Sequence, residues 1–294
     1  MLESAWRIHV EPVWANVPVN KVSATGVRGW TASMTGAGCS ATTVLRCLGV
    51  LAGVLDDAIA DGCISKNPAR GLDPKKREKP TKPRRKHVYL DHDAVARLAD
   101  ESGQHKTLVL VLAYTGIRWG EAVALRVRHV DEVRHRLLVT DNAVQLGVDH
   151  ALGDPKDDEH REVPMPKFVM AELKKHIGNR GPDDLVFGDG VNYLPRPKSM
   201  DGWFVGAVKR AKVQKITPHD LRHTAASLAI SAGANVLAVS RMLGHENPQV
   251  TLKTYADLFD TDLDKVSDAL DTAHRKSVSK RGPKRVRQLR KVAE

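Results

Sequence analysis

The chain has 294 residues, of which 41% are hydrophobic, and a formal net charge of +11. This length and apolar content allow a sizeable core and favour two domains. No basic segment with an apolar core follows Met1 and no apolar run is long enough to cross a bilayer, which argues against secreted and membrane-anchored proteins and predicts a cytoplasmic one. Cys39, Cys47 and Cys63 are odd in number and lack C-x-x-C spacing. We interpret them as reduced core residues and not as a disulfide or zinc site.

Positive charge is concentrated in two segments that contain few acidic residues. Residues 75–86 have eight Lys or Arg and one Glu, and residues 275–294 have nine and one. Together these segments exceed the net charge of the whole chain, so the remainder is net negative. Neither has an apolar helical face for lipid, which favours nucleic acid over a membrane as the partner. The predicted DNA contacts of the first segment are Lys75, Lys76, Arg77, Lys79, Lys82, Arg84, Arg85 and Lys86.

Residues 1–72 are predicted to form a small helical domain. Apolar residues recur at helical spacing over residues 2–14, where a proline interrupts the pattern. Ser23 is a candidate cap for a second helix, and Ser40 for a third that ends at Gly62. The predicted buried faces carry Val27, Trp30 and Met34 on the second helix and Val44, Leu48, Leu51, Leu55 and Ile59 on the third.

A basic linker is predicted at residues 73–88. Pro74, Pro80 and Pro83 alternate with Lys and Arg, a composition that favours an extended, solvated chain. Such a tether can follow a phosphate backbone while it joins two domains. The alternative, a linker that is basic only for solubility, is weaker because residues 273–294 are predicted to form a second basic segment, a C-terminal tail.

The second domain is predicted at residues 89–272 and combines helices with a small antiparallel sheet. The apolar run 107–114 predicts a buried helix, although periodicity alone also allows a strand. Arg118 follows this run, and Glu121 lies three residues further on the same helical face, where it can pair with the arginine. The other predicted elements are a helix capped by Asp91, strands at 137–146 and 161–165 with a polar connection at 147–160, helices at 167–177 and 199–213, and a helix from His219 towards Ala232 capped by Thr217.

Residues 217–255 carry the side chains that an enzyme needs to hold and attack a phosphodiester. His219 and Arg222 are three residues apart and share one face of the predicted helix. Asn235 is a candidate cap for the next helix, a glycine places His245 at its end, and Tyr255 follows ten residues later. Guanidinium groups bind phosphate oxygens bidentately, imidazoles transfer protons near neutral pH, and a phenol becomes a nucleophile when its proton is removed.

The ordered set of these motifs resembles the signature of the tyrosine recombinase family, in particular phage-type integrases. The motifs are Thr115-Gly-Ile-Arg118-Trp-Gly-Glu121, His219-Asp-Leu-Arg222-His223, Leu243-Gly-His245 and Tyr255. Each is weak alone, but their order with a lone downstream tyrosine is specific. The resemblance covers residues 89–272. It implies a mainly α fold with a small antiparallel β-sheet, in which a helical SAM-like N-terminal core-binding domain precedes an α+β catalytic domain.

The resemblance also implies roles for the matching residues. Arg118 and Arg222 would hold the non-bridging oxygens of the scissile phosphate, where preorganised cations stabilise charge in the transition state. Glu121 would support Arg118. Tyr255 would attack the phosphate and form a 3′-phosphotyrosyl bond. His219 would accept the proton of the phenol, whose ordinary pKa of about 10 leaves it protonated at pH 7.

Two further residues complete the implied catalytic set. His245 would hydrogen-bond the phosphate. Lys156, in the predicted polar connection, would be the acid for the leaving 5′-oxygen, with Lys167 as an alternative just beyond the second strand. Because the covalent bond conserves the phosphodiester energy, no cofactor, ATP or metal is expected.

The expected partner is double-stranded DNA with core-type attachment sites, recombined through a Holliday junction during integration or excision of a phage or mobile element. An apolar stripe at helical spacing predicts a helix after Tyr255, with Leu258 or Phe259, Leu263, Val266 and Leu270. The stripe could pack on its own domain, but the resemblance implies a homotetramer in which residues 257–272 are exchanged in trans between protomers. Truncation after Asp260 is then expected to abolish synapsis and to spare core folding. A host DNA-bending factor and an excisionase are further expected partners, and the expected location is the nucleoid of a bacterial host.

One feature departs from many phage-type integrases, which carry a further N-terminal domain for arm-type sites. This sequence starts within the first predicted helix, with no cap before Leu2. We therefore expect a shortened chain or an alternative start that lacks arm-site affinity in a mobility-shift assay.

Two other functions stay open on the sequence alone. One is a DNA-binding architectural or regulatory protein on the same scaffold without catalysis, against which the complete residue set argues. The other is a metal-dependent phosphohydrolase that uses His219, Asp220 and His223, which would need more ligands than the motifs supply. Taken singly, Tyr255 could be a core tyrosine and His245 a helix cap. We interpret His223 as a helix-surface residue and Asp220 likewise as having no catalytic role.

Overall fold

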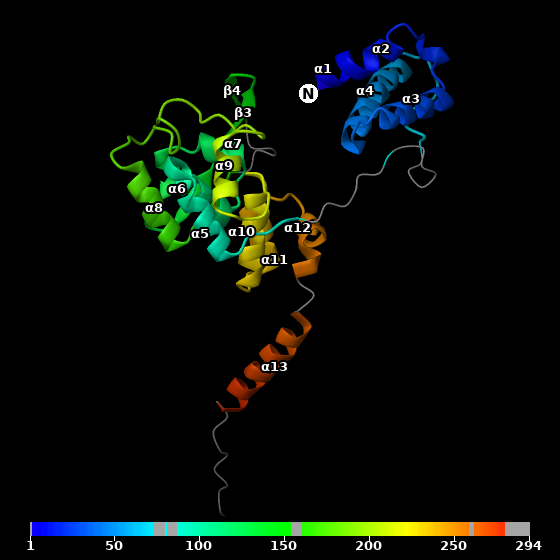
Figure 1. Ribbon diagram of the computed structural model, residues 1–294. Coiled ribbons are helices and arrows are strands. Elements are labelled where there is room, and N and C mark those ends of the chain that lie inside the picture. Colours follow the sequence, from blue (N-terminus) through cyan, green and yellow to red (C-terminus); the bar gives the residue numbers. More distant parts are fainter. Residues whose placement is uncertain (1, 73–79, 81–86, 154–159, 259–261, 280–294) are drawn as a thin grey trace, which may run out of the picture. The chain divides into compact units, whose positions relative to one another are not determined.

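The structure, a computed structural model, describes residues 2–72, 80, 87–153, 160–258 and 262–279 (Figure 1). The chain divides into two compact units, Met1–Lys86 and His87–Glu294. Within the described residues, no helix has both the length and the apolarity that a membrane span requires.

The first unit is helical, as predicted. Its elements are α1 (Leu2–Ala5), a π-helical turn (Trp6–Val10), α2 (Glu11–Trp14), a 3-10 turn (Val19–Lys21), α3 (Ala24–Gly36) and α4 (Ala41–Ala60). The Oγ atoms of Ser23 and Ser40 accept hydrogen bonds from the backbone N–H groups of Gly26 and Thr43, which confirms both predicted caps. Gly62 adopts a φ of +72°, which is suited to a helix stop.

The predicted apolar stripes form the core of the first unit with one exception. Trp30 of α3 meets Trp14 edge to face, with ring centroids 5.8 Å apart. Ile59 was expected on the buried face of α4, but it is exposed in the last turn of that helix. The residues buried as predicted are Val27, Trp30, Met34, Val44, Leu48, Leu51 and Leu55.

Helices dominate the second unit as well. They are α5 (His92–Asp100), a 3-10 turn (Gly103–His105), α6 (Lys106–Thr115), α7 (Trp119–Ala124), a 3-10 turn (Val127–His129), α8 (Lys167–Ile177), α9 (Trp203–Arg210), α10 (Asp220–Ser231), α11 (Val236–Leu243), α12 (Pro248–Tyr255), a 3-10 turn (Ala256–Leu258) and α13 (Asp262–Ser279). The run 107–114 is helical, which excludes the strand alternative. It lies in α6, which packs against α5, α8 and α10.

The strands differ from the prediction in two ways. They are β1 (Val130–Asp131), β2 (Arg136–Val139), β3 (Asn142–Leu146), β4 (Asp149–Gly153) and β5 (Arg161–Pro164). The predicted strand 137–146 is divided, because β2 pairs with β1 and β5 whereas β3 pairs with β4 in a separate sheet. The predicted connection 147–160 contains β4, which returns beside β3 after a turn at Gly147 with φ +67°.

The division of the strand follows from packing against α7. Ala143 of β3 is buried with Val123 and Ala124 of α7. A Cβ atom on Gly120 would lie 2.2 Å from Oδ1 of Asn142 and 2.7 Å from the Ala143 carbonyl oxygen. The absence of a side chain at Gly120 therefore lets β3 leave the first sheet and lie on α7.

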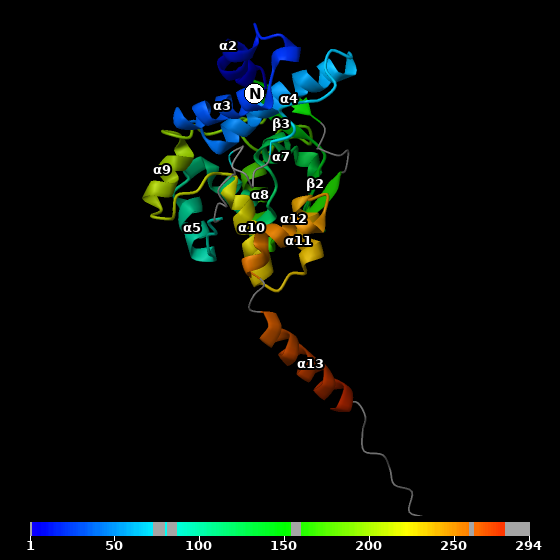
Figure 2. The same ribbon diagram turned by 90° about the vertical axis from the view of Figure 1, so that its right-hand side faces the viewer.

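The motifs from His219 to Tyr255 are distributed over α10, α11 and α12, which lie together in the second unit (Figure 2). α10 begins at Asp220, and the hydroxyl of Thr217 donates to the Asp220 carboxylate instead of accepting a backbone N–H, so the predicted Thr217 cap is wrong in detail. Asn235 caps α11 as predicted. Gly244 ends α11 with a φ of +64°. The helix predicted at 199–213 is shorter, because α9 spans only Trp203–Arg210.

A helix also follows Tyr255, as the apolar stripe predicted. α13 continues to Ser279, which is beyond the predicted end of the domain at residue 272. Leu270, one member of the stripe, is 67% exposed.

Candidate active site

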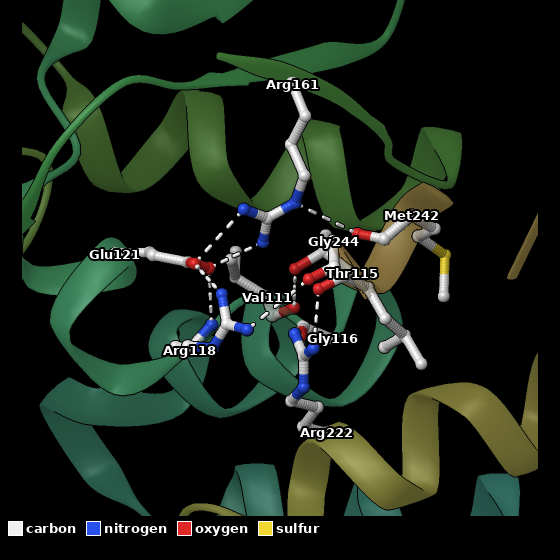
Figure 3. Close-up of polar contacts among 10 residues, drawn as sticks. Val111, Thr115, Gly116, Arg118, Glu121, Arg161, Arg222, Met242 and Gly244 are labelled. Atoms are coloured by element: carbon white, nitrogen blue, oxygen red, sulfur yellow. Dashed lines mark hydrogen bonds and ion pairs between the residues drawn. The ribbon is translucent and has the colours of Figure 1, made fainter. Parts of the chain in front are cut away.

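Three arginines from different parts of the second unit converge on the C-terminal end of α11 (Figure 3). Arg118 is the N-cap residue of α7, Arg161 begins β5 and Arg222 lies in the first turn of α10. They donate to three successive carbonyl oxygens: Arg161 Nε to Met242 at 3.3 Å, Arg222 Nη2 to Leu243 at 2.5 Å, and Arg118 Nη2 to Gly244 at 3.4 Å. The free carbonyls of a helix end carry partial negative charge, so they stabilise this cluster of cations.

The loop before Arg118 depends on a glycine. Gly116 ends α6 in the left-handed region, and its carbonyl accepts from Arg222 Nη1 at 2.6 Å. A Cβ atom there would lie 2.6 Å from Cδ2 of Leu243 and 3.2 Å from Cβ of Ala225. Only glycine therefore combines this backbone conformation with close packing against α10 and α11.

Glu121 lies between two of the arginines. Its carboxylate accepts from the backbone N–H and Nη1 of Arg118, both at 2.8 Å, which confirms the predicted ion pair. It also accepts from Arg161 Nη1 at 3.1 Å and Nη2 at 2.6 Å. Burial acts to raise the pKa of Glu121, but the hydrogen bonds and charge of Arg161, together with Arg118, outweigh it and hold the pKa below its usual value. The sequence prediction missed Arg161.

Arg222 is the most deeply buried of the three cations, with 5% of its surface exposed. Burial, followed by the charge of Arg118, lowers its pKa to about 10. The guanidinium is therefore still charged at neutral pH. Its two hydrogen bonds to backbone carbonyls fix its orientation, so it is preorganised for an anion.

His245 stands directly after the glycine that ends α11. Its Nδ1 is hydrogen-bonded to Oγ1 of Thr251 at 2.8 Å. Burial, then the charges of Arg222 and Arg118, lower the pKa of His245 to about 4. The ring is therefore neutral near pH 7, and the bond to Thr251 leaves Nε2 available to another group.

His219 is exposed and precedes α10. Its pKa is lowered by partial desolvation of the ring and by the nearby charge of Arg222. A neutral imidazole with solvent access is able to accept a proton.

Tyr255 is not presented to solvent. It is the last residue of α12, only 1% of its surface is exposed, and its hydroxyl is hydrogen-bonded to Nδ1 of His223 at 2.9 Å. Burial raises the pKa of Tyr255 to about 12. A phenol in this state is protonated and is a poor nucleophile.

The partner of Tyr255 corrects our interpretation of His223 as a surface residue. His223 is partly buried, and its ring lies 4.0 Å from that of His87 between centroids. Burial, then His87 and His219, lower the pKa of His223 to about 4. Tyr89 also lies beside Tyr255, with centroids 6.3 Å apart. No spacing in the sequence indicates this contact, because the two partners are 32 residues apart.

Several predicted site residues lie outside the described part of the chain. Lys156 falls within 154–159, and the eight linker cations fall within 73–79 and 81–86. Their predicted roles therefore stay predictions. Lys167, the alternative to Lys156, is exposed at the start of α8.

A cationic cleft of about 720 Å³ adjoins the site. Its lining includes Thr217 and Pro218, which precede His219, and Phe204 and Val208 of α9. The basic side chains that line it are Arg196, Lys198, Lys209, Lys212 and Lys215. None of the described residues that line the cleft is acidic, so it suits a polyanion. Because the five basic residues are dispersed over 20 positions, their clustering was not predicted.

The pattern of the phage integrase family matches residues 89–262, which contain all the motifs above. The chain belongs to the phage integrase family. A tyrosine recombinase of Thermosipho africanus is 30% identical to it over 74% of this chain and 72% of that protein. The integrase of Mycobacterium phage D29 is 28% identical over 84% of this chain and 66% of that protein.

Solved structures agree with the fold of this family member. An integrase of the transposon Tn1549 in complex with transposon right end DNA superposes with a TM-score of 0.72 at 23% identity, over 92% of each chain. A lambda integrase tetramer bound to a Holliday junction gives 0.65 at 15% identity, over 86% of this chain and 70% of that one. The predicted fold class, mainly helical with small antiparallel sheets, is therefore confirmed.

The metal-dependent alternative finds no support in the second unit. Among the described residues, no group of three His, Cys, Asp or Glu side chains is arranged to hold a metal ion. His219 and His223 face each other edge to face, with centroids 5.4 Å apart.

Proposed function

We propose that this chain is a site-specific DNA recombinase that cuts and rejoins strands through a covalent bond between Tyr255 and a 3′-phosphate. The observation that carries the proposal is the pair Arg118 and Arg222, held by fixed hydrogen bonds beside a neutral His245. The family match and the relatives named tyrosine recombinase and integrase support it.

In the proposed cleavage step the phosphate sits on the guanidinium groups of Arg118 and Arg222. The hydroxyl oxygen of Tyr255 attacks phosphorus, and its proton passes to His219. The bond from phosphorus to the 5′-oxygen breaks, and that oxygen takes a proton from Lys156. The negative charge that develops on the non-bridging oxygens is stabilised by the two arginines and by a hydrogen bond from His245.

Rejoining reverses this step with the 5′-hydroxyl of the other strand as the nucleophile. No external energy is needed, because the phosphodiester bond is replaced by a phosphotyrosyl bond and then restored. Glu121 supports the step by holding Arg118 through both its backbone N–H and its guanidinium.

Cleavage also requires that Tyr255 leave its stored position. The phenol must break its hydrogen bond to His223 and move out of the apolar surroundings that raise its pKa. Since Tyr255 ends α12, movement of this helix and of the following 3-10 turn would release it.

We assign the grip on DNA to three basic regions: the linker 73–88, the tail 273–294 and the cleft beside His219. The cleft has basic side chains that include Lys209 and Lys212 and reaches Pro218, next to His219, which suits a duplex whose phosphates extend beyond the cut. The proposed substrate is a core-type attachment site, bound by residues 1–72 together with 89–272.

The proposed assembly is a homotetramer that recombines two sites through a Holliday junction, with residues 257–272 exchanged between protomers. The lambda integrase tetramer on a Holliday junction is a precedent on this fold. A DNA-bending factor and an excisionase in the bacterial cytoplasm complete the proposal. Its test is a chain truncated after Asp260, which is expected to fold and to bind core sites but to form no synaptic complex.

A nicked suicide substrate that carries the core site tests the chemistry. Wild-type protein is expected to give an SDS-resistant covalent adduct, and Tyr255→Phe none, with core-site binding retained. Tyr114→Phe is a matched control, because this change also removes a hydrogen bond between a tyrosine and a histidine, His92 at 2.8 Å, but outside the arginine cluster. It is expected to keep adduct formation.

The outcomes also separate the alternative functions. DNA binding without any adduct on the correct core site would indicate a non-catalytic architectural or regulatory protein. Strand cleavage that survives Tyr255→Phe and stops with EDTA would indicate a metal-dependent phosphohydrolase.

A further inference from the structure

Arg161 is the third cation of the arginine cluster, and the proposed cleavage step does not use it. Its side chain is 13% exposed, whereas that of Arg118 is 39% exposed. Nε donates to the Met242 carbonyl, and the two terminal nitrogens donate to the two oxygens of Glu121. Each of the three nitrogens therefore has a protein partner, and the two terminal nitrogens are both directed to Glu121.

The contacts of Arg161 connect two parts of the site that are far apart in the sequence. On one side it holds Glu121, which in turn holds Arg118. On the other side it holds the end of α11, where a Cβ atom on Gly244 would lie 2.8 Å from Nε of Arg161. The next residue is His245. Arg161 therefore adds a second link between the element that carries Arg118 and the element that carries His245, beside the direct bond from Arg118 to Gly244.

Charge balance in the cluster also indicates a supporting role for Arg161. Glu121 is buried and carries a negative charge, so it needs more than one cationic partner to offset its desolvation. With Arg161 present, the carboxylate is shared and Arg118 keeps net positive charge for a phosphate. Without it, Arg118 would be the sole partner of Glu121 and its charge would be neutralised.

We propose that Arg161 is a positioning residue for strand cleavage, which acts through Glu121 and the α11 terminus to keep Arg118 and His245 aligned on the phosphate. This inference rests on the proposed recombinase function. It predicts that a change at Arg161 alters the rate of cleavage and not the affinity for DNA, because Arg161 is held by Glu121 and Met242 and is not among the residues that line the cleft.

The test compares Arg161→Lys with wild type on the suicide substrate. Lysine keeps the charge but cannot donate to both oxygens of Glu121 and to Met242 at once. The single-turnover rate of adduct formation is expected to fall about 10- to 100-fold, the range found when a hydrogen-bond partner that orients a metal ligand is lost. The dissociation constant for core-site DNA is expected to stay within about threefold.

Arg134→Lys is the matched control. Arg134, in the turn between β1 and β2, also donates to a glutamate, Glu162 of β5 at 2.9 Å, but this pair is exposed and outside the cluster. Its adduct rate is expected to equal that of wild type. Rates are measured well below the unfolding midpoint of each variant, so that lost stability does not lower them.

A double variant tests whether Arg161 acts through Glu121. Glu121→Gln alone is expected to lower the rate. Arg161→Lys combined with Glu121→Gln is expected to be about as slow as the slower single variant, and not as slow as the product of the two effects.

Three results would overturn the inference: a wild-type rate in Arg161→Lys, a full loss of DNA affinity, or a variant too unstable to fold, which would make Arg161 a structural residue only. Failure of the recombinase function itself is distinguishable, since wild-type protein would then form no adduct.

Discussion

The two halves of the active site are built in opposite ways. On the arginine side, Arg118 and Arg222 each make at least two hydrogen bonds to fixed groups, and Arg161 is bonded to Glu121 and Met242 beside them. On the tyrosine side, the phenol of Tyr255 is buried, which keeps it protonated, and it is hydrogen-bonded to His223. The proposed phosphate-binding half is preorganised, whereas the proposed nucleophile is buried and protonated.

This difference is consistent with the proposed chemistry. A preorganised cation cluster lowers the barrier because no reorganisation is needed when charge develops. A permanently exposed tyrosine would instead allow cleavage by a protein that has not assembled on both sites. Storage of Tyr255 therefore separates DNA binding from cutting, and variants of the two halves should change the cleavage rate in opposite directions.

The largest expected effect is on the arginine side. Arg222→Gln removes the positive charge and the paired N–H donors of the guanidinium. The rate of adduct formation is therefore expected to fall about 10²- to 10³-fold, as when a preorganised donor is lost. The carbonyls of Gly116 and Leu243 lose their donors, which should also reduce the free energy of unfolding by about 1–3 kcal/mol. Suicide-substrate kinetics and denaturant unfolding measure the two effects. A fall in rate below tenfold in a folded variant would contradict a preorganised Arg222.

A change on the tyrosine side should act in the other direction. His223→Leu leaves the stored phenol without its partner, which destabilises the stored state by about 1–3 kcal/mol. The released population, and with it the adduct rate, is expected to rise about tenfold, since 1.4 kcal/mol corresponds to a factor of ten. Single-turnover adduct formation at saturating DNA measures the rate.

The control for His223→Leu is His92→Leu, which removes the equivalent partner of Tyr114 outside the site. It is expected to leave the adduct rate unchanged. A lower rate in His223→Leu would mean that His223 takes part in the chemistry and does not merely store Tyr255.

Low pH is expected to reduce the stability of both halves of the site, because His223 and His245 are neutral in the folded protein. The pKa values of His223 and His245 are about 4 in the folded protein, below the ordinary value of 6.5. Between pH 6.5 and 4 the unfolded chain binds more protons, so stability is fully present above about pH 6.5 and is lost as pH falls towards 4. The unfolding midpoint is expected to decrease from pH 7 to pH 5. His223→Leu should show a shallower decrease, and an unchanged slope would argue against a buried neutral His223.

The smallest effect is expected at the cleft. Lys209→Gln combined with Lys212→Gln should weaken DNA binding and reduce the slope of log affinity against log salt by up to about 1.8, at about 0.9 per phosphate contact. The adduct rate at saturating DNA should be unchanged, because neither lysine contacts the arginine cluster. Binding titrations at several salt concentrations measure the slope. An unchanged slope would place the duplex away from the cleft.

Local rules explain why most helices were predictable. Ser23, Ser40, Asp91 and Asn235 were chosen as caps from their residue type and place, and each accepts a backbone hydrogen bond two or three residues ahead. These contacts depend only on neighbouring residues, so the sequence contains them. The divided strand was not predictable in this way, because β3 follows the surface of α7 through the close approach at Gly120.

The sequence by itself determined the residue types of the site, their order and the helices that carry them, because motif spacing and caps are local properties. Tertiary structure decided how those residues are connected. The bonds from Arg161 to Glu121 span 40 residues and that from His223 to Tyr255 spans 32, and no periodicity relates such distant positions. The burial of Tyr255 and the support of Arg118 arise from these long-range contacts. Only the folded chain therefore shows that the arginines are held in place and that the Tyr255 hydroxyl is buried and hydrogen-bonded.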